Sequence, residues 1–364
     1  MHFFRTYLLP GFVFQSVIIA GGYATGRELI EFFFVAGPIG GVLGLMVSGL
    51  VFSLVLAVGF ELARITRAYD YRHFCRELLG RGWFLFEIFY MIQLLLVLSI
   101  IGSASGNLIS EAFAVPPLIG TLILMGFIGV LTFNGSETIK KVLAGWSILL
   151  YGVYIILFVL AYKNFGPEIN NTYLNAPIGD GWLSSGVLYS GYNLATLPVV
   201  LFAISHHKNI KETFGSGLIA GPIAVIPAIL FFVALMGQYP EISDEAVPSI
   251  YLMSVLNIGW FEILFQVVIF GTFVETGTAM LHAVNERLQR SFSDQGKSLP
   301  RSARPLIALF ILSIAVFAAE NFGIINLIAK GYGLLTLIFI AILIVPLMTI
   351  GVWKIYRNRI SQET

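Results

Sequence analysis

The stretch GGYATGRE, residues 21–28, decides how this sequence is interpreted. It lies inside an otherwise apolar run from about residue 7 to about residue 36, and it places three glycines and two charged side chains near the middle of that run. Glycine weakens a helix, and each unsatisfied polar group in hydrocarbon costs several kcal/mol. The stretch therefore predicts a membrane helix that is broken near its middle.

Composition places the chain in a membrane. Hydrophobic residues make up 57% of its 364 residues and charged residues only 11%, and the mean hydropathy is +0.88. Such a chain carries too little charge to cover a water-soluble domain. The formal net charge of +1 does not suggest a nucleic-acid partner, and the single cysteine, Cys75, excludes an internal disulfide.

Ten apolar runs are predicted to cross the bilayer, because a hydrocarbon core about 30 Å thick needs roughly 20 residues of helix. The predicted spans are 7–36, 38–63, 82–112, 116–133, 142–162, 182–205, 213–238, 258–286, 305–320 and 324–353. The acidic segment 241–256 is too short to span and is predicted to form an amphipathic helix on the outer surface. We expect one all-α integral membrane domain over residues 1–364.

Lysine and arginine predict the orientation, since they accumulate on the cytoplasmic side of membrane proteins. With ten spans, 18 of the 21 basic residues fall on one side. They are Arg5, Arg64, Arg67, Arg72, Arg76, Arg81, Lys140, Lys141, Lys208, Lys211, Arg287, Arg290, Lys297, Arg301, Arg304, Lys354, Arg357 and Arg359. We therefore expect a multi-pass protein of the cytoplasmic (inner) membrane with both termini in the cytoplasm.

A second polar interruption, SGYN at residues 190–193, lies near the middle of the sixth span. Spans one and six occupy the same place in two successive five-helix halves, 7–162 and 182–353. Because each half holds an odd number of spans, the two halves are inverted relative to each other. Gly-interrupted segments at equivalent positions of two halves are a sequence pointer to the binding site of a transporter.

Breaking a helix inside a membrane creates a polar site. The break frees backbone carbonyls and N–H groups and leaves half-helix ends with partial charges. Lipid cannot satisfy these groups, so they have to line a cavity walled by protein. A carboxylate suits a half-helix N-terminus, whereas a cation or an ammonium group suits the freed carbonyls. A zwitterion fits both.

The ten spans, the IIAGGYATGRE segment (18–28) and the YSGYN segment (189–193) resemble the amino acid–polyamine–organocation superfamily, most closely its bacterial YkvI-like branch of amino acid permeases. The resemblance extends over nearly the whole chain. It implies a LeuT-like fold of two inverted five-helix repeats with helices one and six discontinuous, and alternating access around a site formed by spans one, three, six and eight. Carried over by position, the substrate-binding residues are Gly21, Gly22, Tyr23, Ala24, Thr25, Gly26, Ser190, Gly191, Tyr192 and Asn193.

A packing role is the alternative interpretation of these residues. Glycines in membrane helices also serve as close-packing points. Tyr23 and Tyr192 can be buried packing residues whose hydroxyls still need partners. For Asn193, beside a glycine near the centre of a span, contact with the ligand or its pocket is favoured.

Four charged residues near the first break are candidate gate residues. Arg27 and Glu31 are i, i+4 neighbours that can form an ion pair, with Glu28 beside them. Glu111, at the outer end of span three, can join them. The alternative is an ion pair at the outer rim whose long side chains reach water.

Glu275 is the candidate coupling residue. If span eight covers 258–286, its midpoint near residue 272 puts Glu275 about 5 Å from the centre at 1.5 Å per residue. In sodium-coupled relatives this region supplies hydroxyls to a cation, and Thr272 and Thr276 match that pattern as i, i+4 neighbours, whereas the added acid departs from it. Glu275 can complete an oxygen site for Na⁺, carry a proton itself, or serve packing alone.

We therefore expect a secondary active transporter that imports an amino acid or a similar small zwitterion, preferably a neutral one, coupled to H⁺ or Na⁺. The expected partners are this solute and the lipid bilayer; we expect no cofactor and no resident metal, and the oligomeric state is not predicted. A channel or a transporter-like sensor stays open. An intramembrane enzyme is less favoured, because the sequence has no G-x-S-x-G, H-E-x-x-H or Cys/His grouping.

Overall fold

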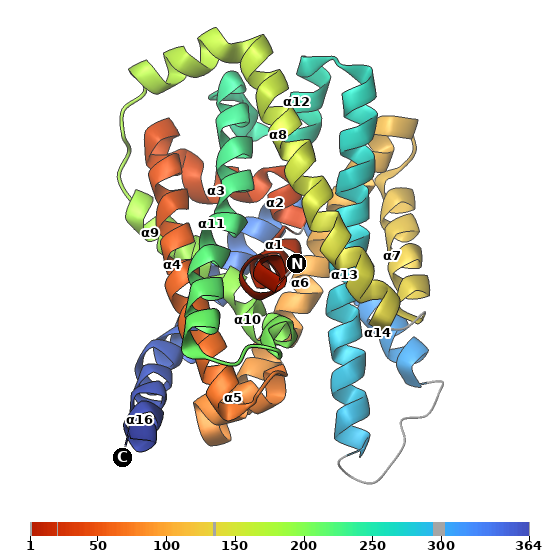
Figure 1. The fold of residues 1–364 in the computed structure, drawn as a ribbon. Coiled ribbons are helices and arrows are strands. Elements are labelled where there is room, and N and C mark those ends of the chain that lie inside the picture. The colour runs from red at the N-terminus through yellow and green to blue at the C-terminus, as the bar shows by residue number, and fades with distance from the viewer. Residues whose placement is uncertain (1, 20, 134–135, 294–302, 364) are drawn as a thin grey trace.

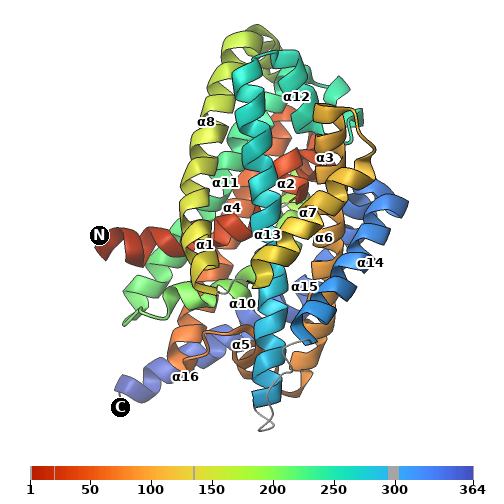
Figure 2. The same cartoon turned by 90° about the vertical axis from the view of Figure 1, so that its right-hand side faces the viewer.

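The computed structural model describes residues 2–19, 21–133, 136–293 and 303–363, and these ranges contain helices and no strand (Figure 1). The predicted all-α class is confirmed. The longest helices form a bundle in which they run roughly along one direction (Figures 1 and 2). They are α4 (Gly37–Thr66), α6 (Trp83–Phe113), α8 (Ser136–Asn175), α11 (Ile210–Leu235) and α13 (Gly259–Ser293).

Shorter elements complete the bundle. They are η2 (Phe34–Ala36), η3 (Gly80–Gly82), α7 (Pro117–Phe133), η6 (Met236–Gln238), α14 (Ala303–Asn326), η8 (Leu327–Tyr332), α15 (Gly333–Phe339), η9 (Ile340–Ile344), η10 (Leu347–Gly351) and α16 (Val352–Glu363). The molecule has two opposite ends, called here the α12 end, with η7 (Glu241–Asp244) and α12 (Pro248–Leu256), and the α5 end, with α5 (Tyr71–Leu79) (Figure 1).

Seven helical segments of the described residues are long and apolar enough to cross a membrane. They are Arg27–Thr66, Tyr71–Phe113, Ile148–Asn175, Trp182–Ile204, Ile210–Gln238, Gly259–His282 and Leu306–Ser361. The shorter apolar helix Pro117–Thr132 corresponds to the fourth predicted span. Segments are fewer than predicted spans because neighbouring spans run together, at Gly37 (φ 74°) and at Gly323 (φ 66°), where positive φ turns the chain without a loop.

The first predicted span, 7–36, is discontinuous. It consists of η1 (Phe4–Leu8), α1 (Leu9–Ile18), α2 (Gly21–Thr25) and α3 (Arg27–Phe33). Gly26, with φ 83°, separates α2 from α3. Figure 1 looks almost down the axis of α1, and Figure 2 shows α1 lying across the long helices, so the first half of this span does not run with the bundle.

The sixth predicted span is discontinuous as well. It consists of α9 (Trp182–Asn193), η4 (Leu194–Thr196), α10 (Leu197–Val200) and η5 (Leu201–Ile204). Pro198 lies in the first turn of α10, where its missing N–H leaves no intrahelical bond unmade. The α-helix therefore gives way to tighter turns directly after the SGYN segment.

Helices α4 and α11, which are spans two and seven, are packed backbone to backbone. A Cβ added to Gly217 would overlap the backbone of Ala57, and one added to Gly221 would overlap the carbonyl of Gly49. The Ser53 hydroxyl donates to the carbonyl of Leu218 at 2.8 Å. Glycine is required here because no side chain fits between the two backbones.

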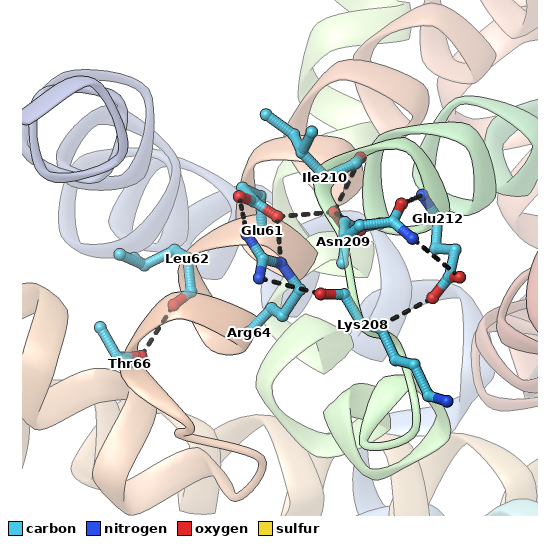
Figure 3. A network of polar contacts seen from close by, with 9 residues as sticks. Glu61, Leu62, Arg64, Thr66, Lys208, Asn209, Ile210 and Glu212 are labelled. Atoms are coloured by element: carbon cyan, nitrogen blue, oxygen red, sulfur yellow. Dashed lines mark hydrogen bonds and ion pairs between the residues drawn. The ribbon is translucent and has the colours of Figure 1, made fainter. Parts of the chain in front are cut away.

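A polar network at the α5 end joins α4 to the start of α11 (Figure 3). Arg64 forms a two-point ion pair with Glu61, with N–O distances of 2.6 and 2.8 Å. Thr213, on α11, donates its hydroxyl to the same carboxylate at 2.6 Å. Arg64 also donates to the carbonyl of Lys208 at 3.4 Å. The network therefore connects the equivalent helices of the two repeats by side chains as well as by backbone packing.

We expect Thr213→Val to lower the thermal stability of the purified protein, because a hydrogen bond to a charged group contributes about 1.5–3 kcal/mol. Thr66→Val is the matched control, since the Thr66 hydroxyl donates to the Leu62 carbonyl of its own helix at 2.7 Å. The measurement is the melting temperature of both variants in detergent. Equal melting temperatures would contradict a stabilising link between α4 and α11 through Thr213.

Candidate functional site

The first helix break lies in the interior of the bundle, and part of its freed backbone is satisfied locally. Tyr23, Ala24 and Thr25 are buried. The Thr25 hydroxyl donates to the carbonyl of Gly22 at 2.9 Å, and the N–H of Gly26 donates to the carbonyl of Tyr23 at 2.9 Å. The Thr25 side chain is therefore used to hold the break in shape.

Glu28 points into the break. Its side chain is buried, and one of its carboxyl oxygens accepts a hydrogen bond from the Tyr192 hydroxyl. The Tyr332 hydroxyl and the backbone amide of Tyr23 also interact with this carboxyl. A Cβ added to Gly22 would overlap it. The structure therefore separates Glu28 from the other candidate gate residues and brings it together with the substrate-site candidates of both breaks.

The polar groups of the second break form hydrogen bonds with α6 and within their own helix. Gln93, on α6, donates to the carbonyl of Tyr192 at 2.9 Å. Asn193 donates to the carbonyl of Tyr189 at 2.9 Å, and Ser190 to the carbonyl of Gly186 at 2.8 Å. The amide N–H₂ of Asn193, expected to face a ligand, is thus engaged within its own helix.

Gly191 is a close-packing position. A Cβ added to it would lie 2.8 Å from Cγ2 and 3.0 Å from the carbonyl oxygen of Thr336, on α15. This geometry matches the packing alternative for Gly191. Gly22, in contrast, faces the Glu28 carboxyl, so the two glycines of the two breaks have different surroundings.

Aromatic rings surround the contact between Glu28 and Tyr192. The Tyr192 ring stacks on the Tyr332 ring with centroids 4.2 Å apart and an interplanar angle of 11°. Phe32 and Tyr189 each lie 5.7 Å from the Tyr192 ring, one stacked and one edge-on. Among the described residues, the hydroxyls of Tyr23, Tyr154 and Tyr189 are buried without a hydrogen-bond partner. The region therefore combines apolar walls with polar atoms that lack partners.

Glu275 lies against the first half of span one. The Ser16 hydroxyl, on α1, donates to one carboxyl oxygen of Glu275 at 2.6 Å. In the part of the chain that the structure describes, the other carboxyl oxygen, the Thr276 hydroxyl and both amide atoms of Gln15 have no partner. All four unpartnered atoms belong to α1 and α13, the two helices that the bond between Ser16 and Glu275 joins.

Thr272 differs from its two predicted companions. Its hydroxyl donates to the carbonyl of Val268 at 2.8 Å and accepts from the Trp146 ring nitrogen at 3.0 Å. The hydroxyl of Thr276 and one oxygen of Glu275 are left for a ligand, whereas the hydroxyl of Thr272 is already engaged. The described residues hold no group of three or more His, Cys, Asp or Glu side chains arranged to bind a metal.

Arg27 ties α3 to the α12 end. Its guanidinium donates to the carbonyls of Ser243 at 2.7 Å and Glu245 at 3.1 Å, and it pairs with Glu31 at 3.3 Å. We call these four residues the Arg27 closure. The ion pair between Arg27 and Glu31 forms as the i, i+4 spacing predicts. Glu111 is exposed near the end of α6 and is not among the ion-pair partners recorded for Arg27 in the described residues.

Sequence reasoning missed four residues that shape these sites: Gln93, Tyr332, Gln15 and Ser16. Gln93 is a lone amide within an apolar helix, and Gln15 and Ser16 form a polar pair inside the apolar run of span one. A polar side chain at membrane depth normally has a specific partner, so these three residues could have been predicted from the sequence as site residues. Tyr332 carried no comparable signal, because tyrosine is common at the ends of membrane spans.

Comparison with known proteins agrees with this architecture. No family model matches the chain. The uncharacterized membrane protein YkvI of Bacillus subtilis (strain 168) is 24% identical over 339 residues, which cover 92% of this chain and 94% of that protein.

Solved structures share the fold at low sequence identity. A manganese transporter of Eremococcus coleocola matches with a TM-score of 0.65 at 14% identity, covering 94% of this chain and 78% of that one. MhsT in complex with L-phenylalanine matches with a TM-score of 0.57 at 14% identity, covering 96% and 98%. Mhp1, a nucleobase-cation-symport-1 family transporter, matches with a TM-score of 0.55 at 12% identity, covering 90% and 74%. The chain thus has the LeuT-type fold of inverted five-helix repeats, and along nearly its whole length it is a homologue of the YkvI membrane protein.

Proposed function

We propose that this protein is a secondary active transporter that moves an amino acid or a similar small zwitterion across the cytoplasmic membrane by alternating access. The observation that carries the proposal is the meeting of the two helix breaks at Glu28 and Tyr192, with buried polar atoms left without partners around them. Broken helices that meet inside a bundle are typical of transporter binding sites. The similar solved structures are transporters, which supports a transport role over an enzymatic one.

The proposed orientation places the α5 end in the cytoplasm and the α12 end outside. Basic residues gather on α5 and the adjoining turns, at Arg67, Arg72, Arg76 and Arg81, whereas η7 and the residue after it carry Glu241, Asp244 and Glu245. This distribution follows the cytoplasmic accumulation of Lys and Arg. It supports an inner-membrane protein whose solute site is reached alternately from these two ends.

The Arg27 closure would act as the outer gate of this transporter. It joins α3, which carries Glu28 into the solute site, to the segment that leads into α12. Two backbone carbonyls and one carboxylate bind the guanidinium, so the closure depends on Arg27 far more than on Glu31. Opening to the outside then requires release of Arg27 from Ser243 and Glu245.

The group formed by Glu275, Ser16, Thr276 and Gln15 would couple transport to an ion. Its unpartnered atoms are mostly oxygens, which are the ligands that a hard cation such as Na⁺ prefers. A proton on Glu275 would serve the same purpose. Because Ser16 lies on α1, occupation of this group would fix α1 against α13 and so bias the position of the first half-helix.

Transport by purified protein in liposomes tests the proposed function. A saturable, gradient-driven uptake of leucine or another neutral amino acid supports the transporter. Ohmic flux would indicate a channel instead, and ligand binding without flux would indicate a sensor. Dependence of uptake on sodium at fixed pH, or on pH without sodium, identifies the coupling ion.

We expect Glu275→Gln to abolish accumulation driven by an ion gradient while exchange of solute across the membrane persists. The amide keeps the size and the contact with Ser16 but removes the charge that a cation or proton would neutralise. Glu262→Gln, on the same helix and partly exposed, is the control. Full gradient-driven accumulation in Glu275→Gln would exclude Glu275 as the coupling residue.

We expect Arg27→Ala to open the α12 end, and Glu31→Gln to have a much smaller effect because the two carbonyl bonds of Arg27 remain. The measurement is the rate at which an external thiol reagent labels a cysteine at position 24, which is buried in the first break, in a Cys75→Ala background. Equal labelling rates in Arg27→Ala and in the parent protein would show that the closure is a structural ion pair and not a gate.

A further inference from the structure

Glu28 is a buried carboxyl without a cation. Its side chain has 1% relative exposure, and its neighbours are hydroxyl and amide donors. Among the residues that the structure describes, no Lys, Arg or His forms an ion pair with it. The adjacent Arg27 directs its guanidinium to Ser243, Glu245 and Glu31 instead. A buried carboxylate without a cation is costly, so Glu28 has to be neutralised either by a proton or by a positive charge that the described chain does not supply.

The same carboxyl occupies the place that a solute carboxylate would need. The backbone N–H groups of the first turn of α2 are donors that a solute carboxylate would need. Glu28 lies against Gly22 in this turn and interacts with the amide of Tyr23. A solute carboxylate brought here would meet the negative charge of Glu28 at close range. The first break is therefore shaped for the positive end of a solute.

The surroundings of Glu28 fit an organic ammonium group. The rings of Tyr192 and Tyr332 lie beside it and cover one face of each other, and Phe32 stacks on Tyr192, so the ring faces left for a ligand are those of Tyr332 and of the edge-on Tyr189 that these stacks do not cover. Aromatic faces attract ammonium ions through their ring electrons, and cages of such rings are used to bind quaternary and methylated ammonium ligands. The Tyr189 ring packs edge-on against Tyr192, and its buried hydroxyl has no hydrogen-bond partner, so it can accept an N–H bond from such a group.

The surroundings of Glu275, the other buried acid, differ from those of Glu28. Its hydrogen-bond partner is the Ser16 hydroxyl, and the unpartnered hydroxyl of Thr276 belongs to the next residue of the same helix. Oxygen ligands suit a small hard cation or a proton, whereas rings around a carboxylate suit a large, weakly hydrated ammonium ion. The two buried acids therefore have surroundings suited to two different cations.

We propose that Glu28, with the rings of Tyr189, Tyr192 and Tyr332, binds the ammonium group of the solute, so that the solute needs an amine and does not need a carboxylate. This inference rests on the proposed function only in taking the two helix breaks as the solute site. It changes the solute class from zwitterions to compounds held by their amine end, whether or not they carry a carboxylate.

Matched pairs of ligands test the inference on the purified full-length protein. The pairs are leucine with isopentylamine and phenylalanine with phenethylamine, and isopentanol serves as the uncharged control. A ligand that binds the folded state raises the melting temperature in a concentration-dependent way. We expect each amine to bind at least as tightly as its parent amino acid, and isopentanol to give no shift. An absence of shift with both amines, or a shift with the amino acids alone, would overturn the inference.

Two variants separate recognition by Glu28 from a structural role. Glu28→Gln removes the charge and should weaken amine binding at least tenfold, whereas Glu262→Gln should leave it unchanged. Tyr192→Phe keeps the ring but removes the hydroxyl that competes for Glu28, so amine binding should tighten severalfold. If Glu28 served only to hold Tyr192, both Glu28→Gln and Tyr192→Phe would weaken binding alike, and the inference would fail.

Currents on a solid-supported membrane distinguish failure of this inference from failure of the proposed function. Phenethylamine or leucine is added to liposomes with and without protein, and the protein-free signal is subtracted. Amine binding that is lost in Glu28→Gln but produces neither current nor uptake of labelled amine would overturn transport and leave the inference standing. Current with leucine and none with phenethylamine would overturn the inference and leave transport standing.

Discussion

The hydrogen bond between the Tyr192 hydroxyl and the Glu28 carboxyl joins two helices that are broken inside the membrane, and the rest of the structure is arranged around it. Each break frees backbone groups that lipid cannot satisfy. Thr25 donates a hydrogen bond to a carbonyl within the first break, and Gln93, on α6, donates one to a carbonyl of the second break. Because α3 and α9 come from different repeats, one contact fixes the two halves of the fold relative to each other at their most polar point.

Span one connects the two buried acids. Its first half-helix contacts Glu275 through Ser16, and its second half carries Glu28. If Glu275 holds an ion and Glu28 holds a solute, the two sites are contacted by the two halves of the same broken span. Helix α1 lies across the bundle, whereas α3 is tied to the α12 end by Arg27, so the two halves of the span are held by different parts of the structure (Figure 2).

The sequence predicted the features that depend on neighbours along the chain. Glycines and charges inside an apolar run indicated both breaks, and the i, i+4 spacing indicated the pair between Arg27 and Glu31. The side of the helix on which the Glu28 side chain lies could not be predicted in this way. Gly26 has a positive φ, so α3 is reoriented relative to the residues before it. Gln93 and Tyr332 join the site from distant spans, and Gly191 packs on Thr336, so their roles depend on tertiary packing.

The backbone packing of α4 on α11 has a consequence for motion. Gly217 and Gly221 leave no space between the two helices, so sliding one along the other would force overlaps with Ala57 and Gly49. Densely packed contacts of this kind do not deform gradually. We therefore expect the pair to move as one rigid unit, so that the free-energy difference between conformers arises in the elements that move against it.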